Sequence, residues 1–208
     1  MLDYASLREA MKKGNVVEVT RLIDLLLAEG ATAEDILNQG LLEAMSDIGQ
    51  RFKRGELFVP SVLIAARAMK KGTEMLKPLL VKAGAQPVAT AVIGTVKGDL
   101  HDIGKNLVCM MIEGAGFAVI DAGVDVSAEK FVELARQHNA QIIGVSALLT
   151  TTMPGMKSVV EAVRGAGLGA KVIIGGAPVT QAFCDSIGAD GYSADAASAA
   201  ELARSLIA

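Results

Sequence analysis

The feature of this sequence that most constrains its fold is a change in the spacing of apolar residues near Ala83–Pro87. Before it, apolar residues recur at intervals of three and four, which is typical of amphipathic helices. After it, short continuous apolar runs alternate with helical segments, and such runs suit strands that are covered on both faces. We therefore expect a helical-bundle domain over residues 1–83, a linker over 84–88 and an α/β domain over 89–208.

The first region predicts a four-helix bundle. A short helix is expected near 2–12, and Asn15 with Glu18 forms a capping pair ahead of the apolar stripe over 19–26. A second stripe runs from Leu37 to Phe52, and Pro60 suits the first turn of the last helix. The residues of that last helix expected to face the core are Leu63, Ala66, Met69, Leu76 and Leu80.

The second region predicts a flavodoxin-like, Rossmann-type domain with a five-stranded parallel sheet. The apolar runs lie at 88–96, 117–124, 141–148, 171–175 and 190–193, and the helical segments near 105–115, 128–138, 154–166, 179–186 and 195–207. In such a sheet, ligands bind outside the carboxyl ends of the strands, where the strand order reverses. The loops after the first, third and fourth strands are therefore the candidate binding loops.

Composition excludes several classes of function. Lys and Arg total 20 against 23 Asp and Glu, and aromatic residues make up 3% with no Trp, so nucleic-acid binding is not expected. Apolar stretches are interrupted by charges well short of the ~20 residues that a membrane span needs. The acidic, amphipathic start does not resemble a secretory signal, and Cys109 and Cys184 are expected to be free thiols in the cytoplasm.

The loop after the first expected strand contains the pattern D-x-H-x-x-G, formed by Asp99, His101 and Gly104. A carboxylate two residues before a histidine can accept a hydrogen bond from one ring nitrogen and leave the other nitrogen for a metal. The alternative is a solvated loop in which His101 only caps the following helix.

The loops after the third and fourth strands carry hydroxyls and glycines. Ser146, Thr150 and Thr152 cluster at the first of these turns, where ordinary helix capping is the alternative explanation. The adjacent Gly175 and Gly176 remove side chains from the second turn, so a flat ligand could lie against the backbone there. A simple glycine turn is the alternative for this pair.

Taken together, the three loops resemble those of the cobalamin-binding domains, whose signatures are D-x-H-x-x-G, S-x-L and G-G. The stretches 55–60 and 65–69 resemble the helical cap module that precedes the cobalamin domain in methionine synthase and in corrinoid methyltransferase proteins. With both modules, the chain is similar to the corrinoid carrier proteins of methanol, methylamine and aryl-methyl-ether methyltransferase systems. The matching signature residues are Asp99, His101, Gly104, Ser146, Leu148, Gly175 and Gly176.

The resemblance implies cobalamin or a related corrinoid as the cofactor, with methylcobalamin as the loaded state. It implies base-off/His-on binding, in which the nucleotide tail enters the domain beside the sheet and His101 becomes the lower axial ligand of cobalt. Asp99 and Thr152 would form a relay behind His101. The other implied cofactor contacts are Leu100, Asp102, Ile103, Gly104, Ser146, Leu148, Thr150, Gly175, Gly176, Ala177 and Tyr192, with Phe58 and Val62 over the upper face of the corrin.

The function implied by the resemblance is that of a cytoplasmic methyl carrier, which would not turn over alone. A substrate:corrinoid methyltransferase would load it, and a corrinoid:acceptor methyltransferase would pass the methyl group to a thiol or a tetrahydrofolate-type acceptor. A reductive activase is a further candidate partner. Methanol, methylamines, betaines and aryl methyl ethers all stay open as donors.

Three other functions compete with the methyl carrier. A small subunit of an adenosylcobalamin-dependent mutase would share the D-x-H-x-x-G domain but not the helical cap. A response regulator needs an aspartate where Ser146 stands, and a cobalamin-dependent transcription regulator needs a DNA-binding domain for which these residues leave no room. A corrin-free metal site would have to rely on Asp99, His101 and Asp102, which is a thin set of ligands.

Overall fold

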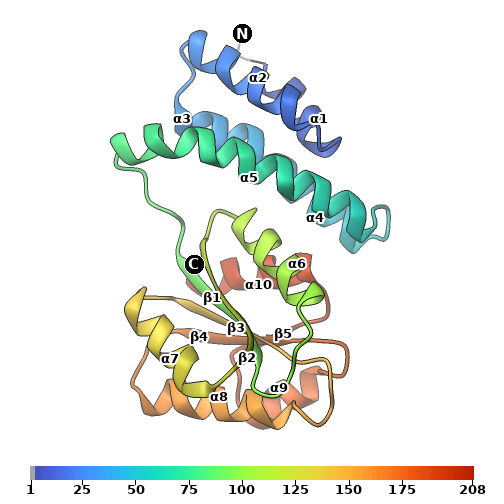
Figure 1. Ribbon diagram of the computed structural model, residues 1–208, viewed down its shortest axis with the longest axis vertical. Helices are drawn as coiled ribbons and strands as arrows, with labels where there is room; N and C mark the ends of the chain where they lie inside the picture. Colours follow the sequence, from blue (N-terminus) through green and yellow to red (C-terminus); the bar gives the residue numbers. More distant parts are fainter. Residues whose placement is uncertain (1–2) are drawn as a thin grey trace. The chain divides into compact units, whose positions relative to one another are not determined.

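The computed structural model describes residues 3–208, which divide into two compact units, one ending at Gln86 and the other spanning Pro87–Ala208. The helical unit has four helical rods, because its middle segments follow one another without a break (Figure 1). Leu2, at the start of the predicted first helix, lies outside the described residues. The elements are α1 (Tyr4–Lys12), α2 (Val16–Ala28), α3 (Ala33–Asp35), the π-helical η1 (Ile36–Leu42), α4 (Glu43–Lys53) and α5 (Val59–Lys82).

Local signals in the helical unit act as the sequence predicts. The Asn15 side chain accepts a hydrogen bond from the Glu18 backbone N–H and so caps the start of α2. Gly30 follows the helix with φ +90°, a conformation that glycine adopts without steric penalty. The four apolar residues of the predicted α2 stripe are Val19, Leu22, Ile23 and Leu26, and all four are buried.

Four residues of the predicted stripes in the helical unit lie at the edge of the core and not inside it, since Leu37, Phe52 and Leu80 are half-buried and Leu63 is exposed. The π-helical turns of η1 insert extra residues per turn, so Ile36, Gly40 and Leu41 are buried whereas Leu37 is only half-buried. A methyl group on Gly40 would lie 2.4 Å from Leu7 Cδ2, which shows how closely the two segments approach. In α5, Leu63 is 39% exposed, and its neighbour Val62 occupies the core instead.

The α/β unit confirms the predicted flavodoxin-like architecture. All five strands are parallel and lie in the order β2-β1-β3-β4-β5, so the order reverses beside β1. The strands are β1 (Thr90–Val96), β2 (Ala118–Val126), β3 (Ile142–Ser146), β4 (Lys171–Gly175) and β5 (Gly191–Ser193). The helices are α6 (Ile103–Glu113), α7 (Ala128–Gln137), α8 (Pro154–Gly165), α9 (Gln181–Ile187) and α10 (Ala196–Ile207).

Helices cover both faces of this sheet. Figure 1 shows α6 and α10 on one face and α7, α8 and α9 on the other, where valines of the central strands pack around Phe131. Burial of both faces explains why the strands read as continuous apolar runs. Among residues 3–208, none of the helices combines the length and apolar character needed to cross a bilayer.

Candidate functional site

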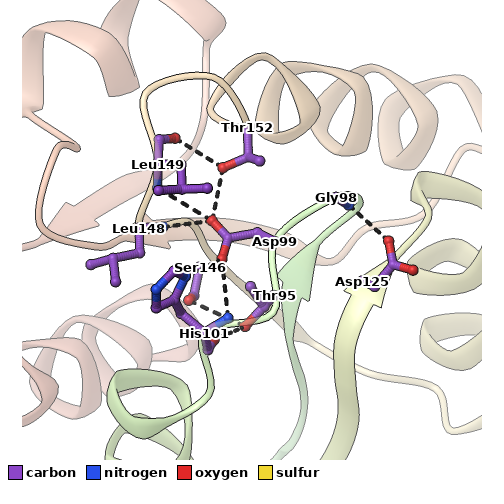
Figure 2. A network of polar contacts seen from close by, with 9 residues as sticks. All are labelled: Thr95, Gly98, Asp99, His101, Asp125, Ser146, Leu148, Leu149 and Thr152. Carbon is purple, nitrogen blue, oxygen red and sulfur yellow. Dashed lines mark hydrogen bonds and ion pairs between the residues drawn. The ribbon is translucent and has the colours of Figure 1, made fainter.

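Asp99 is the centre of a polar network at the carboxyl end of β1 (Figure 2). Its side chain is fully buried, and five donors converge on its two oxygens. Oδ1 accepts from the His101 backbone N–H at 3.1 Å and from His101 Nδ1 at 2.9 Å. Oδ2 accepts from the Leu148 N–H at 2.8 Å, the Leu149 N–H at 3.3 Å and the Thr152 hydroxyl at 2.8 Å. The loops after β1 and β3 are therefore joined through one carboxylate.

This environment keeps Asp99 ionised. Burial by itself would raise the pKa of the carboxyl group, but hydrogen bonds from Leu148, Thr152 and His101 outweigh it and hold the pKa well below its usual range. An ionised carboxylate can only accept, so the proton of the neutral His101 ring belongs on Nδ1. Nε2 then carries a free lone pair, and the His101 side chain is 52% exposed. The geometry presents Nε2 as a ligand for a metal outside the sheet.

A row of small side chains crosses the carboxyl end of the sheet beside this network. Thr95, Ser146, Gly175 and Ser193 stand in register on four neighbouring strands. In-register residues of parallel strands point to the same face, and Gly191, two residues before Ser193, faces Leu202 of α10. The strand ends on the α10 side therefore carry only hydroxyls and a glycine, which lets a narrow ligand approach the backbone.

The hydroxyls of this row are tied to the His101 loop. Thr95 is fully buried, and its hydroxyl donates to the His101 carbonyl at 2.9 Å. The Ser146 hydroxyl lies 3.4 Å from that of Thr95. Figure 2 shows both side chains beside Asp99 and His101, on adjoining strands. Thr95 of β1 therefore holds the backbone of His101, while Asp99 holds its ring.

The three glycines of the signature patterns differ in whether the fold requires a residue without a side chain at that position. Gly176 has φ +132°, and a Cβ there would lie 1.8 Å from the Ala147 carbonyl oxygen, so the fold itself requires glycine. A Cβ on Gly175 would come within 3.1 Å of the Ser193 carbonyl oxygen. Gly104, in contrast, has nothing within 4 Å of its missing Cβ and an ordinary backbone conformation. The fold therefore does not require a glycine at position 104 for steric reasons.

Most of the other predicted contacts lie on the surface of the same loops. Leu100 and Ile103 are 72% and 76% exposed, and Leu148 and Leu149 are partly exposed. Large apolar side chains exposed on the loops around His101 are typical of a binding surface. The remaining predicted residues are Asp102, Thr150 and Ala177, which are exposed, and Tyr192, which is half-buried against the sheet core.

Phe58 and Val62 belong to the helical unit. Phe58 precedes α5 and is 73% exposed, whereas Val62 is fully buried in that helix. Their predicted contact with the corrin stays a prediction, and Phe58 is the one of the two with free side-chain surface.

The geometry argues against helix capping by Thr152 and His101, whereas the close contacts at Gly175 and Gly176 agree with a structural glycine turn. α8 begins at Pro154 with no side-chain cap, and the Thr152 hydroxyl is directed to Asp99 instead. The His101 ring pairs with Asp99 and does not cap α6. Over residues 3–208, no three His, Cys, Asp or Glu side chains are placed to share a metal ion, so a corrin-free site lacks its ligands.

Sequence reasoning missed four residues of the site. Thr95, Leu149 and Ser193 make the contacts described above, and Asp125 accepts from the Gly98 N–H. Thr95 could have been noticed as a hydroxyl at the end of an otherwise apolar run. The others depend on strand register and loop pairing, which leave no local signal.

Comparison with known proteins agrees with the geometry. A B12 binding domain family matches residues 89–201, and a second B12 binding domain family matches residues 4–77. Dimethylamine corrinoid protein 1 of Methanosarcina acetivorans is 47% identical over 177 residues, which are 84% of this chain and 83% of that protein.

Two solved structures are similar over nearly the whole chain. A cobalamin-binding protein from Desulfitobacterium hafniense has a TM-score of 0.82 and 31% identity, with 99% of each chain covered. A chain of the methanol:cobalamin methyltransferase complex MtaBC from Methanosarcina barkeri has a TM-score of 0.89 and 28% identity, covering 98% of this chain and 79% of that one.

A helical unit followed by a parallel sheet with an Asp–His pair at its switch point defines a two-module B12-binding protein. More particularly, the chain belongs to the family of the corrinoid proteins of methyltransferase systems, and its cofactor is a corrinoid.

Proposed function

We propose that this protein carries a methyl group on a corrinoid bound base-off/His-on, with His101 Nε2 as the lower axial ligand of cobalt. The observation that carries the proposal is the Asp99–His101 pair: Nδ1 is engaged at 2.9 Å by a buried carboxylate, and Nε2 has no partner among residues 3–208. A carboxylate that accepts a hydrogen bond from Nδ1 fixes the orientation of the imidazole ring and raises the basicity of the free Nε2.

The rest of the site fits the cofactor's shape. The small side chains of Ser146, Gly175 and Ser193, none of them fully buried, suit the approach of a nucleotide tail to the strand ends. The exposed Leu100 and Ile103, with Leu148, offer an apolar surface to the face of a corrin ring. A glycine at position 104, which the fold does not require, leaves room beside His101.

The residues around His101 could support a change of ligation. When bound, a corrinoid would supply a cobalt centre that accepts and releases a methyl group. The ionised Asp99, which lies at Nδ1 of His101, would stabilise a proton at Nε2 whenever that atom is not a ligand. Thr152 and the Leu148 N–H hold the carboxylate in place throughout.

We further propose two methyltransferase partners. The relatives include a dimethylamine corrinoid protein and a chain of the methanol:cobalamin methyltransferase complex. They support a first partner that transfers a methyl group from its own specific substrate to the bound corrinoid. A second methyltransferase would pass the methyl group to a thiol or a tetrahydrofolate-type acceptor, and a reductive activase would restore the carrier after oxidation. The matched helical module favours this role over that of a mutase subunit.

The experiment is reconstitution with hydroxocobalamin of the wild type, His101→Ala and His138→Ala. His138 is the only other histidine, at the end of α7, so it is the matched control. We expect His101→Ala alone to change the visible spectrum. In the cobalt(II) state, labelling histidine with ¹⁵N should change the axial-nitrogen splitting of the EPR signal from a triplet to a doublet. An unchanged spectrum in His101→Ala, together with an unchanged splitting, would overturn histidine ligation.

A further inference from the structure

Strand β2 is irregular where it passes the site. Its pairing with β1 starts at Thr90–Ala118 and ends at Val96–Val126, so β2 uses two more residues than β1 over the same length. The extra residues lie at two register breaks, and Asp125, which lies within the second of them, has φ +55°. A left-handed conformation is uncommon for a residue other than glycine and is often found beside functional sites.

Asp125 holds the loop that carries Asp99 and His101. Its Oδ1 accepts from the Gly98 N–H at 2.8 Å, and its own N–H donates to the Asp99 carbonyl at 3.0 Å (Figure 2). Its Oδ2 lies 3.2 Å from Lys97 Nζ. The left-handed backbone brings the N–H and the carboxylate of Asp125 to the same loop, so residues 97–99 are fixed to β2 at three points.

Fixing this backbone matters because Asp99 has little freedom. Its oxygens must meet donors from its own loop and from Leu148, Leu149 and Thr152 at the same time. A small tilt of the backbone at Gly98, which itself has φ +83°, would lengthen several of these hydrogen bonds together. The orientation of the His101 ring depends on the same carboxylate.

We propose that Asp125 is a positioning residue for cofactor ligation: by holding the Gly98–Asp99 backbone, it sets the Asp99 carboxylate and through it the His101 ring. The inference rests on the proposed role of His101 as the cobalt ligand. Asp125 contacts Lys97, Gly98 and the Asp99 carbonyl, so its effect on His101 passes through Asp99.

The fold contains a matched contact away from the site. Asp190 accepts from the Val172 N–H at 2.8 Å and lies 3.3 Å from Lys171 Nζ, the same pattern as Asp125 with Gly98 and Lys97. Lys171 begins β4, so this contact is at the amino end of the parallel sheet, opposite the candidate site. If the Asp125–Gly98 contact only stabilises the fold, its removal should affect cobalamin binding no more than removal of the Asp190–Val172 contact does.

Four variants separate the contributions. Asp125→Gly keeps the left-handed backbone but removes the acceptor, whereas Asp125→Asn keeps an acceptor oxygen and tolerates φ above zero. Lys97→Met removes only an exposed ion pair. Asp190→Ala removes the matched acceptor. We expect Asp125→Gly to weaken cobalamin binding about tenfold, Asp125→Asn and Lys97→Met to stay within about threefold of the wild type, and Asp190→Ala to bind normally.

Two measurements decide the question, with His101→Ala as the reference. In the cobalamin-bound protein, Asp125→Gly should move the visible spectrum toward that of His101→Ala, and Asp125→Asn should restore it. In the cofactor-free protein, amide hydrogen exchange should speed up at Leu148 in Asp125→Gly but not at Val172, and Asp190→Ala should show the reverse.

The outcomes distinguish this inference from the proposed function. If His101→Ala alters the spectrum and Asp125→Gly keeps the wild-type spectrum and affinity, the positioning role is overturned and histidine ligation stands. If Asp125→Gly and Asp190→Ala lower cobalamin binding equally, Asp125 serves only the fold. If His101→Ala leaves the spectrum unchanged, both proposals fail together.

Discussion

The helical unit and the α/β unit bury polar groups in opposite ways. Among residues 3–208, the buried polar or charged side chains are Thr95, Asp99 and Lys105, all within one stretch of the α/β unit. The buried side chains of the helical unit are apolar, and the Thr73 hydroxyl oxygen is enclosed there without a partner. Apolar packing accounts for the buried residues of the helical unit, whereas the buried polar residues of the α/β unit need a further explanation.

Each buried polar group of the α/β unit is fully engaged. Thr95 donates to the His101 carbonyl, Asp99 accepts from five donors, and Lys105 contacts both oxygens of Asp121 at 2.5 and 2.6 Å. Burying such groups is unfavourable unless they are paired, so their concentration in one place indicates a function. The buried, hydrogen-bonded polar side chains therefore mark the position of the site in the α/β unit, whereas the apolar core residues do not.

The strongest test of the comparison uses two signature glycines. Gly176→Ala should lower the free energy of unfolding of the α/β unit by at least about 4 kcal/mol, because the methyl group meets the Ala147 carbonyl in a backbone that disfavours it. Gly104→Ala, at a helical position with open space, should keep the stability within about 1 kcal/mol of the wild type.

Cobalamin binding should separate the same two variants. Gly104→Ala should bind about tenfold more weakly while folding normally, since the added methyl group occupies space that the fold leaves open. Denaturant unfolding should be monitored by hydrogen-exchange mass spectrometry, because peptides from the two units report on their unfolding separately. A folded Gly176→Ala protein with wild-type stability would contradict the role of the close approach at Ala147.

The next test addresses the charge of Asp99. Asp99→Asn should lower the free energy of unfolding of the α/β unit by about 3 kcal/mol at pH 7. The variant loses the negative charge, and its side-chain NH2 group faces N–H and O–H donors that bind the carboxylate in the wild type. The folded-state pKa of Asp99 is depressed, so its carboxylate contributes stability above the unfolded value near 3.9, and this contribution is lost as pH falls below it.

Urea unfolding at several pH values checks the sign. The gap between wild type and Asp99→Asn should narrow as the pH falls below about 4, where the Asp99 carboxylate takes up a proton in the unfolded chain. Labelling of Cys184, which is buried in the α/β unit, follows the unfolding of that unit alone. A gap that widens as the pH falls below about 4 would show that Asp99 is not stabilised in its ionised form.

The smallest effect is expected in the helical unit. Thr73→Val replaces a buried, unpartnered hydroxyl with a methyl group of nearly the same shape, so it should raise the stability of that unit by about 1 kcal/mol. The cobalamin spectrum should not change. Thermal unfolding of both proteins is the measurement, and a loss of stability would indicate that a bound water satisfies the hydroxyl.

Much of this molecule could be predicted from the sequence because its signals are local. Strands buried on both faces read as apolar runs, so all five strands of the sheet and the helices between them were anticipated within a few residues. The Asp99–His101 contact spans two residues, and the D-x-H-x-x-G pattern was enough to propose it. Helical periodicity placed Leu37 and Leu63 in the core, whereas the π-helical η1 buries Ile36 and Leu41, and α5 buries Val62 beside the exposed Leu63.

The sequence by itself therefore determined the order of elements, the loops that meet at the switch point and the histidine placed there. Only the tertiary structure decided what holds that histidine. Leu148 and Thr152 reach Asp99 across about fifty residues of chain, and Asp125 reaches Gly98 from the neighbouring strand. Such contacts depend on strand order, register and the irregular pairing of β2, none of which the spacing of apolar residues encodes.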